Sequence, residues 1–191
     1  MSGPLVIATR NAHKLREFAR LLPDVSIEPL PDDVELPPET GDSYVENARI
    51  KARAAARATG RTAFADDSGV EAAALDGAPG IYSARFAGAD ASDAENLAKL
   101  RAAAPAGSAL RYVCAIVLAM PDGGELVVEE RCEGAMAPEP RGERGFGYDP
   151  VFVPADGDGA RTMAELSDEE KDAISHRGRA ARALATRLTA G

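Results

Sequence analysis

Residues 62–88 read TAFADDSGVEAAALDGAPGIYSARFAG, and the apolar run at 63–65 leads directly into the polar sequence DDSG at 66–69. The apolar run predicts a buried strand that ends where the polar residues begin. Two adjacent carboxylates at a strand end repel each other and resist desolvation, so they call for a bound cation or a chemical role. A simple turn is the alternative, because Asp, Ser and Gly all favour turns. These residues alone leave both interpretations open.

Composition limits the class of protein. The chain has 191 residues, 45% hydrophobic and 28% charged, which predicts one soluble domain over residues 1–191. The net charge of -9 argues against binding to a nucleic-acid polymer or to a membrane surface. No apolar run approaches the roughly 20 residues that span a bilayer, and the N-terminus lacks a signal-peptide pattern. We therefore expect a cytoplasmic protein.

Lysine is rare in this chain. Of the 22 basic residues only Lys14, Lys51, Lys99 and Lys171 are lysines, and the others are arginines. Lysine carries a compact, strongly hydrated charge, so a lysine kept against this bias is a candidate for a site that needs such a charge.

A polar turn, TRNAHK at 9–14, follows the apolar run at 5–8 and leads into a helical pattern. The N-terminus of a helix presents free backbone N–H groups and the positive end of the helix dipole, so this turn is a candidate anion site. Arg10, His13, Lys14 and Arg16 add positive charge. The alternative interpretation is a solvated helix start with scattered basic residues.

The remaining elements follow from periodicity and from turn and capping residues. Helices are predicted after Ser-x-x-Glu capping boxes that begin at Ser43, Ser92 and Ser167. Strands are predicted at 25–30, 109–120, 125–132 and 151–153, with a hairpin turn at 121–124. Glu39 lies in the proline-rich loop 31–41 that enters a helix, where it could be presented as a metal ligand.

Two clusters occupy the last third of the chain. In GFGYDP, at 145–150, glycines alternate with aromatic residues, and rings beside closely approachable backbone suit a planar base. Lys171, His176 and Arg177 gather basic charge in an acidic chain, with an exposed basic helix surface as the alternative. Cations for phosphates, carboxylates for Mg²⁺ and rings for a base together describe a nucleoside triphosphate site, although the chain has no P-loop motif.

Five segments of the chain resemble motifs of a known family. The segments ATRNAHKLREF, GDSYVENARIKA, ADDSGVEAAALDGAPGIYSARFAG, GFGYDPVF and LSDEEKDAISHRG, in this order, are similar to motifs of the inosine/xanthosine triphosphate pyrophosphatase family. The resemblance implies an α/β fold in which an elongated mixed β-sheet is flanked by helices, as a single domain with two lobes around a central cleft. It also implies a homodimer and Mg²⁺-dependent cleavage of ITP, dITP or XTP to the monophosphate and pyrophosphate.

The resemblance further assigns residues to roles. Asp67 is the implied catalytic base, and Glu39 is the implied metal ligand. We also expect Asp66 and Asp67 to hold the metal ion, with a supporting role as the alternative for Asp66. The family usually has Gly where this chain has Arg10, which could add a phosphate contact. The implied substrate-binding residues are Thr9, Arg10, Asn11, Ala12, His13, Lys14, Ser68, Phe146, Gly147, Tyr148, Asp149, Lys171, His176 and Arg177.

Two alternative functions remain at this stage. One is a related nucleotide pyrophosphatase with another base specificity. The other is a non-catalytic nucleotide sensor, which would have no need of a general base such as Asp67.

Overall fold

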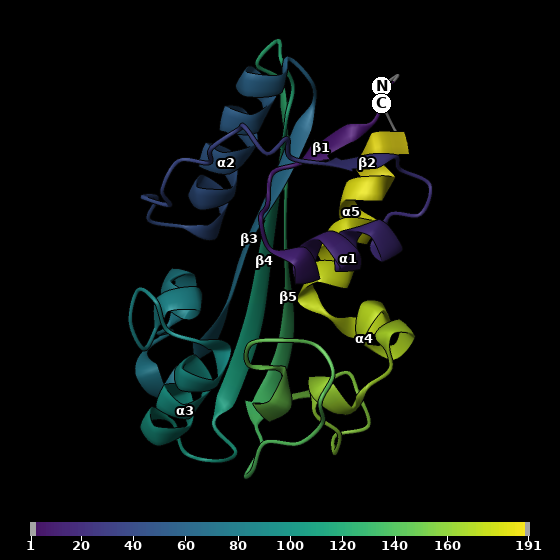
Figure 1. Ribbon diagram of the computed structural model, residues 1–191. Helices are drawn as coiled ribbons and strands as arrows, with labels where there is room; N and C mark the ends of the chain where they lie inside the picture. The colour runs from purple at the N-terminus through teal and green to yellow at the C-terminus, as the bar shows by residue number, and fades with distance from the viewer. Residues whose placement is uncertain (1–2, 190–191) are drawn as a thin grey trace. The chain divides into compact units, whose positions relative to one another are not determined.

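The computed structural model describes residues 3–189 and contains a six-stranded mixed sheet flanked by helices (Figure 1). The strand order is β2-β1-β3-β4-β5-β6. Strand β1 (Leu5–Ile7) runs parallel to β2 (Ile27–Pro29) and to β3 (Ala63–Ala72). Strand β6 (Phe152–Pro154) pairs antiparallel with β5 (Glu125–Met136). The predicted fold class, a mixed α/β sheet with flanking helices, is confirmed.

The chain divides into two compact units. The first unit comprises Met1–Asp67, Cys114–Glu130 and Ala180–Gly191, and the second comprises Ser68–Val113 and Arg131–Arg179. Strand β4 (Ala109–Ala119) and the other long strands contribute residues to both units.

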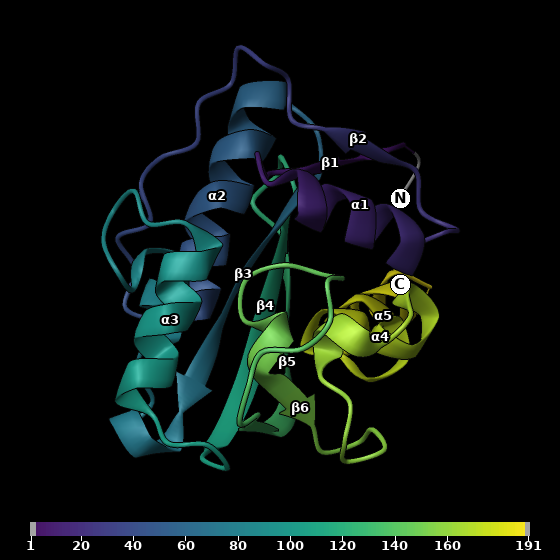
Figure 2. The ribbon, with the colours of Figure 1, turned by 60° about the horizontal axis from the view of Figure 1, so that its bottom comes forward.

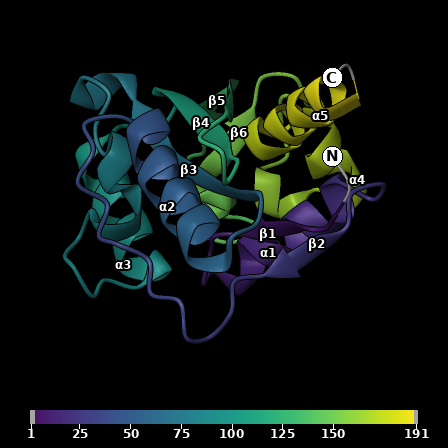
Figure 3. The same cartoon turned by 90° about the horizontal axis from the view of Figure 1, so that it is seen from above.

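In the first unit, helices cover both faces of the sheet (Figures 1 and 3). Side chains alternate between the two faces along each strand. Phe64 of β3 packs in a core with α1 (Ala12–Leu21) and with the part of α5 (His176–Thr189) from Ala180 onward. Ala65, the next residue, packs in a separate core against α2 (Tyr44–Thr59). The alternation therefore decides which helix each strand residue meets.

The second unit has one core. It joins Val70 of β3, Leu110 of β4 and Cys132 of β5 to Leu100 of α3 (Asp93–Ala103). The short helix α4 (Asp168–Ile174) precedes α5 in the chain (Figure 2). Its last residue, Ile174, packs against this core.

N-cap serines begin three of the helices largely as the sequence predicts. Ser92 and Ser167 form complete capping boxes with the glutamates three positions later. Ser43 accepts a hydrogen bond from the N–H of Glu46 at 3.2 Å, but the Glu46 carboxylate binds the N–H of Asp42 at 2.7 Å. The predicted capping box at Ser43 is therefore only half formed, because Glu46 reaches one residue further back.

The predicted strand end at DDSG is wrong, as is the alternative that DDSG forms a turn. Strand β3 continues through these residues to Ala72. Apolar side chains resume at Val70 and Ala72, and both are fully buried in the core of the second unit. Asp66 and Asp67 are 2% and 6% exposed, so the two carboxylates lie inside a strand and need partners.

Within residues 3–189, none of the helices combines the length and the apolar character that crossing a bilayer requires.

Candidate functional site

The sequence-predicted site residues fall into two groups, one in each unit. The carboxylate cluster of the first unit comprises Lys14, Glu39, Asn47, Lys51, Asp66 and Asp67. The aromatic cluster of the second unit comprises Ser68, Tyr112, Phe146, Asp149, Lys171, His176 and Arg177. The structure brings the predicted residues together within each cluster.

Asp66 and Asp67 have different partners because adjacent strand residues point to opposite faces. On the α1 face, the Lys14 ammonium lies 2.9 Å from Oδ2 of Asp66, whose side chain is completely buried. On the α2 face, the amide of Asn47 donates to Oδ2 of Asp67 at 3.2 Å. Lys51 Nζ lies 3.7 Å from Oδ1 of Asp67. The structure thus separates two carboxylates that the sequence places side by side.

Lys51 is the centre of the carboxylate cluster. Its ammonium donates to Oε1 of Glu39 at 2.5 Å and to the backbone oxygen of Asp66 at 2.8 Å, in addition to its ion pair with Asp67. Burial lowers the pKa of Lys51, but the nearby carboxylates outweigh burial and leave this pKa raised. Lys51 is therefore a buried permanent cation that links the loop carrying Glu39 to β3.

Asp67 has the properties of a proton acceptor. Burial is the largest influence and raises its pKa, Lys51 opposes that effect, and Glu39 adds to it. The net pKa is above the ordinary value for an aspartate. A carboxylate with a raised pKa accepts a proton more readily, which is what general-base chemistry requires.

The turn at 9–14 caps helix α1 with its own side chains. Asn11 Oδ1 accepts from the backbone N–H groups of His13 and Lys14 at 2.9 and 3.2 Å. Thr9 Oγ1 accepts from the N–H of Asn11 at 3.1 Å. Asn11, Ala12 and His13 are exposed. The turn is therefore ordered while its surface is open to solvent, and its assignment to phosphate binding stays a prediction.

Arg10 binds the neighbouring loop. Its guanidinium donates to the backbone oxygens of Leu30 at 2.9 Å, Pro31 at 2.6 Å and Val34 at 2.7 Å, and it lies 3.6 Å from the Asp32 carboxylate. A guanidinium has five N–H donors, so these three bonds use most of its capacity. Arg10 thus ties the turn at 9–14 to the start of the loop that carries Glu39, and a phosphate contact by Arg10 stays a prediction.

The predicted metal ligands fit a hard cation by their chemistry. Within residues 3–189, no group of three or more His, Cys, Asp or Glu side chains is arranged to hold a metal ion. Glu39 and Asp67 nevertheless both pair with the ammonium of Lys51, so their carboxylates converge on one position that already holds positive charge. Carboxylate oxygens are the ligands that Mg²⁺ prefers. The carboxylate of Asp66 forms its ion pair with the ammonium of Lys14 instead.

Asp149 organises the aromatic cluster. Its Oδ2 accepts from the backbone N–H of Phe146 at 3.0 Å and from Lys171 Nζ at 2.8 Å, and its Oδ1 accepts from the Tyr112 hydroxyl at 3.1 Å. Gly145 has φ +73, and a Cβ built there would lie 2.0 Å from Oδ2 of Asp149. Only glycine therefore allows the chain to pass so close to this carboxylate.

The three basic residues of the aromatic cluster are buried rather than spread over a helix surface. Lys171, His176 and Arg177 are 5%, 5% and 2% exposed. The Lys171 ammonium and the Arg177 guanidinium lie 5.4 and 5.5 Å from the centre of the Phe146 ring. Arg177 also donates to Oγ of Ser68 at 2.8 Å. The alternative of an exposed basic surface is therefore wrong, because all three side chains are buried. A carboxylate and an aromatic ring beside them stabilise the buried positive charge.

Gly147 and Tyr148 form hydrogen bonds that hold the backbone of the GFGY segment in place. The N–H of Gly147 donates to Oδ2 of Asp93 at 2.8 Å, and the Tyr148 hydroxyl donates to the backbone oxygen of Ser83 at 2.7 Å. These bonds fix the segment that presents Phe146, and direct base contacts by Gly147 and Tyr148 stay predictions.

Sequence reasoning missed three residues of these clusters. Asn47 and Lys51 lie on α2, four residues apart and therefore on one helix face, and both reach Asp67. The rarity of lysine was the one signal that pointed to Lys51. Tyr112 lies in the longest apolar run, and nothing in that pattern distinguishes it from a core residue.

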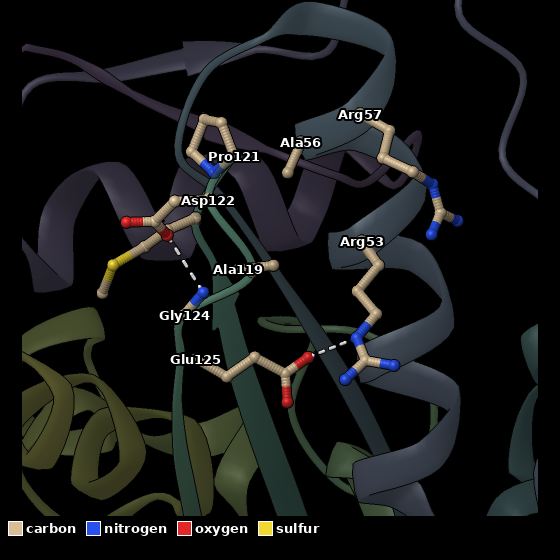
Figure 4. Close-up of a pocket in the computed structure, with 10 residues that line it drawn as sticks. Arg53, Ala56, Arg57, Ala119, Pro121, Asp122, Gly124 and Glu125 are labelled. Atoms are coloured by element: carbon tan, nitrogen blue, oxygen red, sulfur yellow. Dashed lines mark hydrogen bonds and ion pairs between the residues drawn. The ribbon is translucent and has the colours of Figure 1, made fainter.

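A pocket of about 320 Å³ lies elsewhere in the first unit, between α2 and the turn that joins β4 to β5 (Figure 4). Its charged lining includes Arg53 and Arg57, and Arg53 pairs with Glu125 at 2.5 Å. None of the sequence-predicted site residues lines this pocket.

Comparisons with known proteins agree with the resemblance. The profile of the Ham1 family matches residues 5–187. A dITP/XTP pyrophosphatase of Mycolicibacterium paratuberculosis is 50% identical, with 97% of this chain and 96% of that protein covered. The solved structure of a HAM1 protein from Coxiella burnetii has a TM-score of 0.85 at 46% identity and covers 98% of this chain and 99% of that one. The Ham1 protein of Staphylococcus aureus has a TM-score of 0.81 at 41% identity, with the same coverage.

Replacing Lys51 by Met should lower the free energy of unfolding by about 3 kcal/mol near neutral pH, because two carboxylates would lose a buried cation. Lys51 lowers the pKa of Asp67, so its removal raises that pKa further. Protonation then relieves the repulsion, and the loss should shrink as pH falls. Urea unfolding at about pH 7 and about pH 5 measures this, with the exposed Lys99→Met as control. Equal losses for Lys51→Met at both pH values would contradict the prediction.

Replacing Arg10 by Lys should loosen the loop at 31–41, because an ammonium keeps the charge but cannot reach three carbonyl oxygens in fork geometry. We expect faster hydrogen exchange of the backbone amides in this loop, measured by mass spectrometry. Arg57→Lys, at an exposed position on α2, is the matched control. Unchanged exchange in Arg10→Lys would show that the three hydrogen bonds do not hold the loop.

Proposed function

Because the chain belongs to the Ham1 family, we propose that it hydrolyses non-standard purine nucleoside triphosphates, namely ITP, dITP and XTP, to the monophosphate and pyrophosphate. One observation carries the proposal. Asp67 is a buried carboxylate with a raised pKa that Asn47 and Lys51 hold in place, and it stands at the position that the resemblance gives to the catalytic base.

Each cluster offers groups that suit one part of the proposed substrate. The turn at 9–14 offers backbone N–H groups at a helix N-terminus and the ammonium of Lys14, which suit phosphate oxygens. The aromatic cluster offers the Phe146 ring for stacking and the cations Lys171 and Arg177 beside it.

Glu39 and Asp67, with Asp66 as a further predicted ligand, would hold Mg²⁺. When bound, the ion supplies neutralisation of the charge on the phosphates. The convergence of Glu39 and Asp67 on the Lys51 ammonium supports this assignment, because it marks a position where positive charge is stabilised.

The proposed chemistry is a hydrolysis with Asp67 as general base. The Asp67 carboxylate takes a proton from a water molecule as the water oxygen attacks the α-phosphorus. A new P–O bond forms, the bond from the α-phosphorus to the bridging oxygen breaks, and pyrophosphate leaves with the electron pair of that bond. Lys14 stabilises the negative charge that accumulates on the leaving group.

Base selectivity follows from hydrogen-bond donors. Hypoxanthine and xanthine carry a 6-oxo group, whereas adenine carries a 6-amino group. His176 and Arg177 are donors that adenine would leave unpaired in a buried site, and such sites reject analogues by roughly 10⁴-fold in good cases. Guanine also has a 6-oxo group, so its 2-amino group must be refused by shape or by desolvation.

A homodimer and a cytoplasmic location complete the proposal. The homodimer rests on the resemblance alone, and the cytoplasmic location rests on the sequence pattern. Light scattering in solution measures the oligomeric state directly. A molar mass of one chain would contradict the dimer.

A panel of triphosphates tests the function. With Mg²⁺ present, ITP, dITP and XTP should each yield monophosphate and pyrophosphate, with kcat/KM well above the values for GTP and ATP. Adenine lacks the 6-oxo group, and guanine carries the 2-amino group that shape or desolvation must refuse. Separate assays for pyrophosphate and for inorganic phosphate identify the bond that is cleaved. Equal hydrolysis of ITP and GTP would contradict the selectivity, and nucleotide binding without any product would indicate a sensor.

Replacing Asp67 by Asn should lower kcat by about 10²–10⁴-fold, because the amide cannot accept the proton from water. The fold should persist, since Asn has nearly the same shape. Initial rates and a thermal unfolding curve for the same preparation check both statements. Asp24→Asn, an exposed carboxylate, is the control. Near-normal turnover in a folded Asp67→Asn protein would remove Asp67 from the mechanism.

A further inference from the structure

We propose that Tyr112 is a positioning residue that sets base selectivity by holding His176 and Asp149 in place. This inference rests on the proposed function and extends it to a residue of β4 that the sequence presents only as part of an apolar run. Tyr112 is 6% exposed and contacts both residues through different parts of its side chain.

The ring of Tyr112 orients the imidazole of His176. The two rings are stacked with centroids 4.5 Å apart and an angle of 14° between their planes. Tyr112 also stacks on Phe152, with centroids 4.3 Å apart and an angle of 24° between the ring planes. The ring that contacts His176 is therefore itself packed against a second ring, and side chains packed in this way keep one conformation. A donor aimed at a base can discriminate only if its direction is fixed.

The hydroxyl of Tyr112 orients the carboxylate of Asp149. It donates to Oδ1, while Oδ2 holds the Phe146 backbone and the Lys171 ammonium. Burial raises the pKa of Tyr112 well above its ordinary value, and the charge of Asp149 adds to this effect. The phenol therefore keeps its proton and remains a donor. Through Asp149, Tyr112 fixes both the ring and the ammonium of the aromatic cluster.

The test compares the ratio of kcat/KM for ITP to kcat/KM for ATP among variants. Tyr112→Leu removes both the ring and the hydroxyl and should lower this ratio about tenfold or more, mainly by raising KM for ITP. Tyr112→Phe keeps the stack on His176 and should retain part of the ratio. A loss of stability alone reduces the amount of active enzyme, which affects both substrates equally and leaves the ratio unchanged.

Leu100→Ala provides the control, because it removes a fully buried side chain of α3 from the same core and leaves the ring and the hydroxyl of Tyr112 intact. It should reduce stability in a thermal unfolding curve while keeping the preference for ITP. If Tyr112→Leu does not fold, Tyr112→Met takes its place, since Met fills an irregular gap more readily.

The outcomes separate this inference from the function on which it rests. A wild-type protein that cleaves no triphosphate, or cleaves ITP and ATP equally, would contradict the proposed function itself. A selective wild type whose preference is unchanged in folded Tyr112→Leu or Tyr112→Met would overturn the role of Tyr112 alone. Equal loss of preference in Leu100→Ala would overturn it as well, since general repacking of the core would then explain the result.

Discussion

The alternation of side chains along β3 is the constraint on which the carboxylate cluster depends. Because consecutive residues of a strand point to opposite faces, the carboxylates of Asp66 and Asp67 pair with different side chains. Asp66 lies on the face of Phe64, which α1 covers, and Asp67 lies on the face of Ala65, which α2 covers. Each buried carboxylate then requires a partner from the helix above it.

Those partners come from residues far along the chain. Lys14 on α1 pairs with Asp66, and Asn47 and Lys51 on α2 contact Asp67. A buried charge without a partner would cost several kcal/mol, so the packing of each helix and the neutralisation of each carboxylate are coupled. The same arrangement leaves Asp67 with a raised pKa, since Lys51 offsets burial only in part. The burial and the pairing that hold Asp67 in place therefore also determine its pKa.

Much of the fold could be predicted from local pattern, and the failures have a common physical cause. Helix starts at Ser92 and Ser167 and the hairpin at 121–124 depend on neighbouring residues alone, and the structure contains them. The continuation of β3 beyond residue 65 does not depend on neighbouring residues alone. DDSG has turn propensity, and only the burial of Val70 and Ala72 in the second core makes the strand continue. Local pattern also failed to identify Lys51 and Tyr112 as site residues, because their partners lie 12 to 64 residues away in the sequence.

The placement of the lysines shows how composition and structure are connected. In a chain that otherwise uses arginine, Lys14, Lys51 and Lys171 each pair with a buried or partly buried carboxylate. Lys51 meets two carboxylates and a backbone oxygen that converge from three directions. An ammonium with three donors around one atom fits that geometry, whereas a planar guanidinium fits flat or forked acceptors such as the loop carbonyls bound by Arg10. The shape of the acceptor set therefore determines which of the two cations is used at each position.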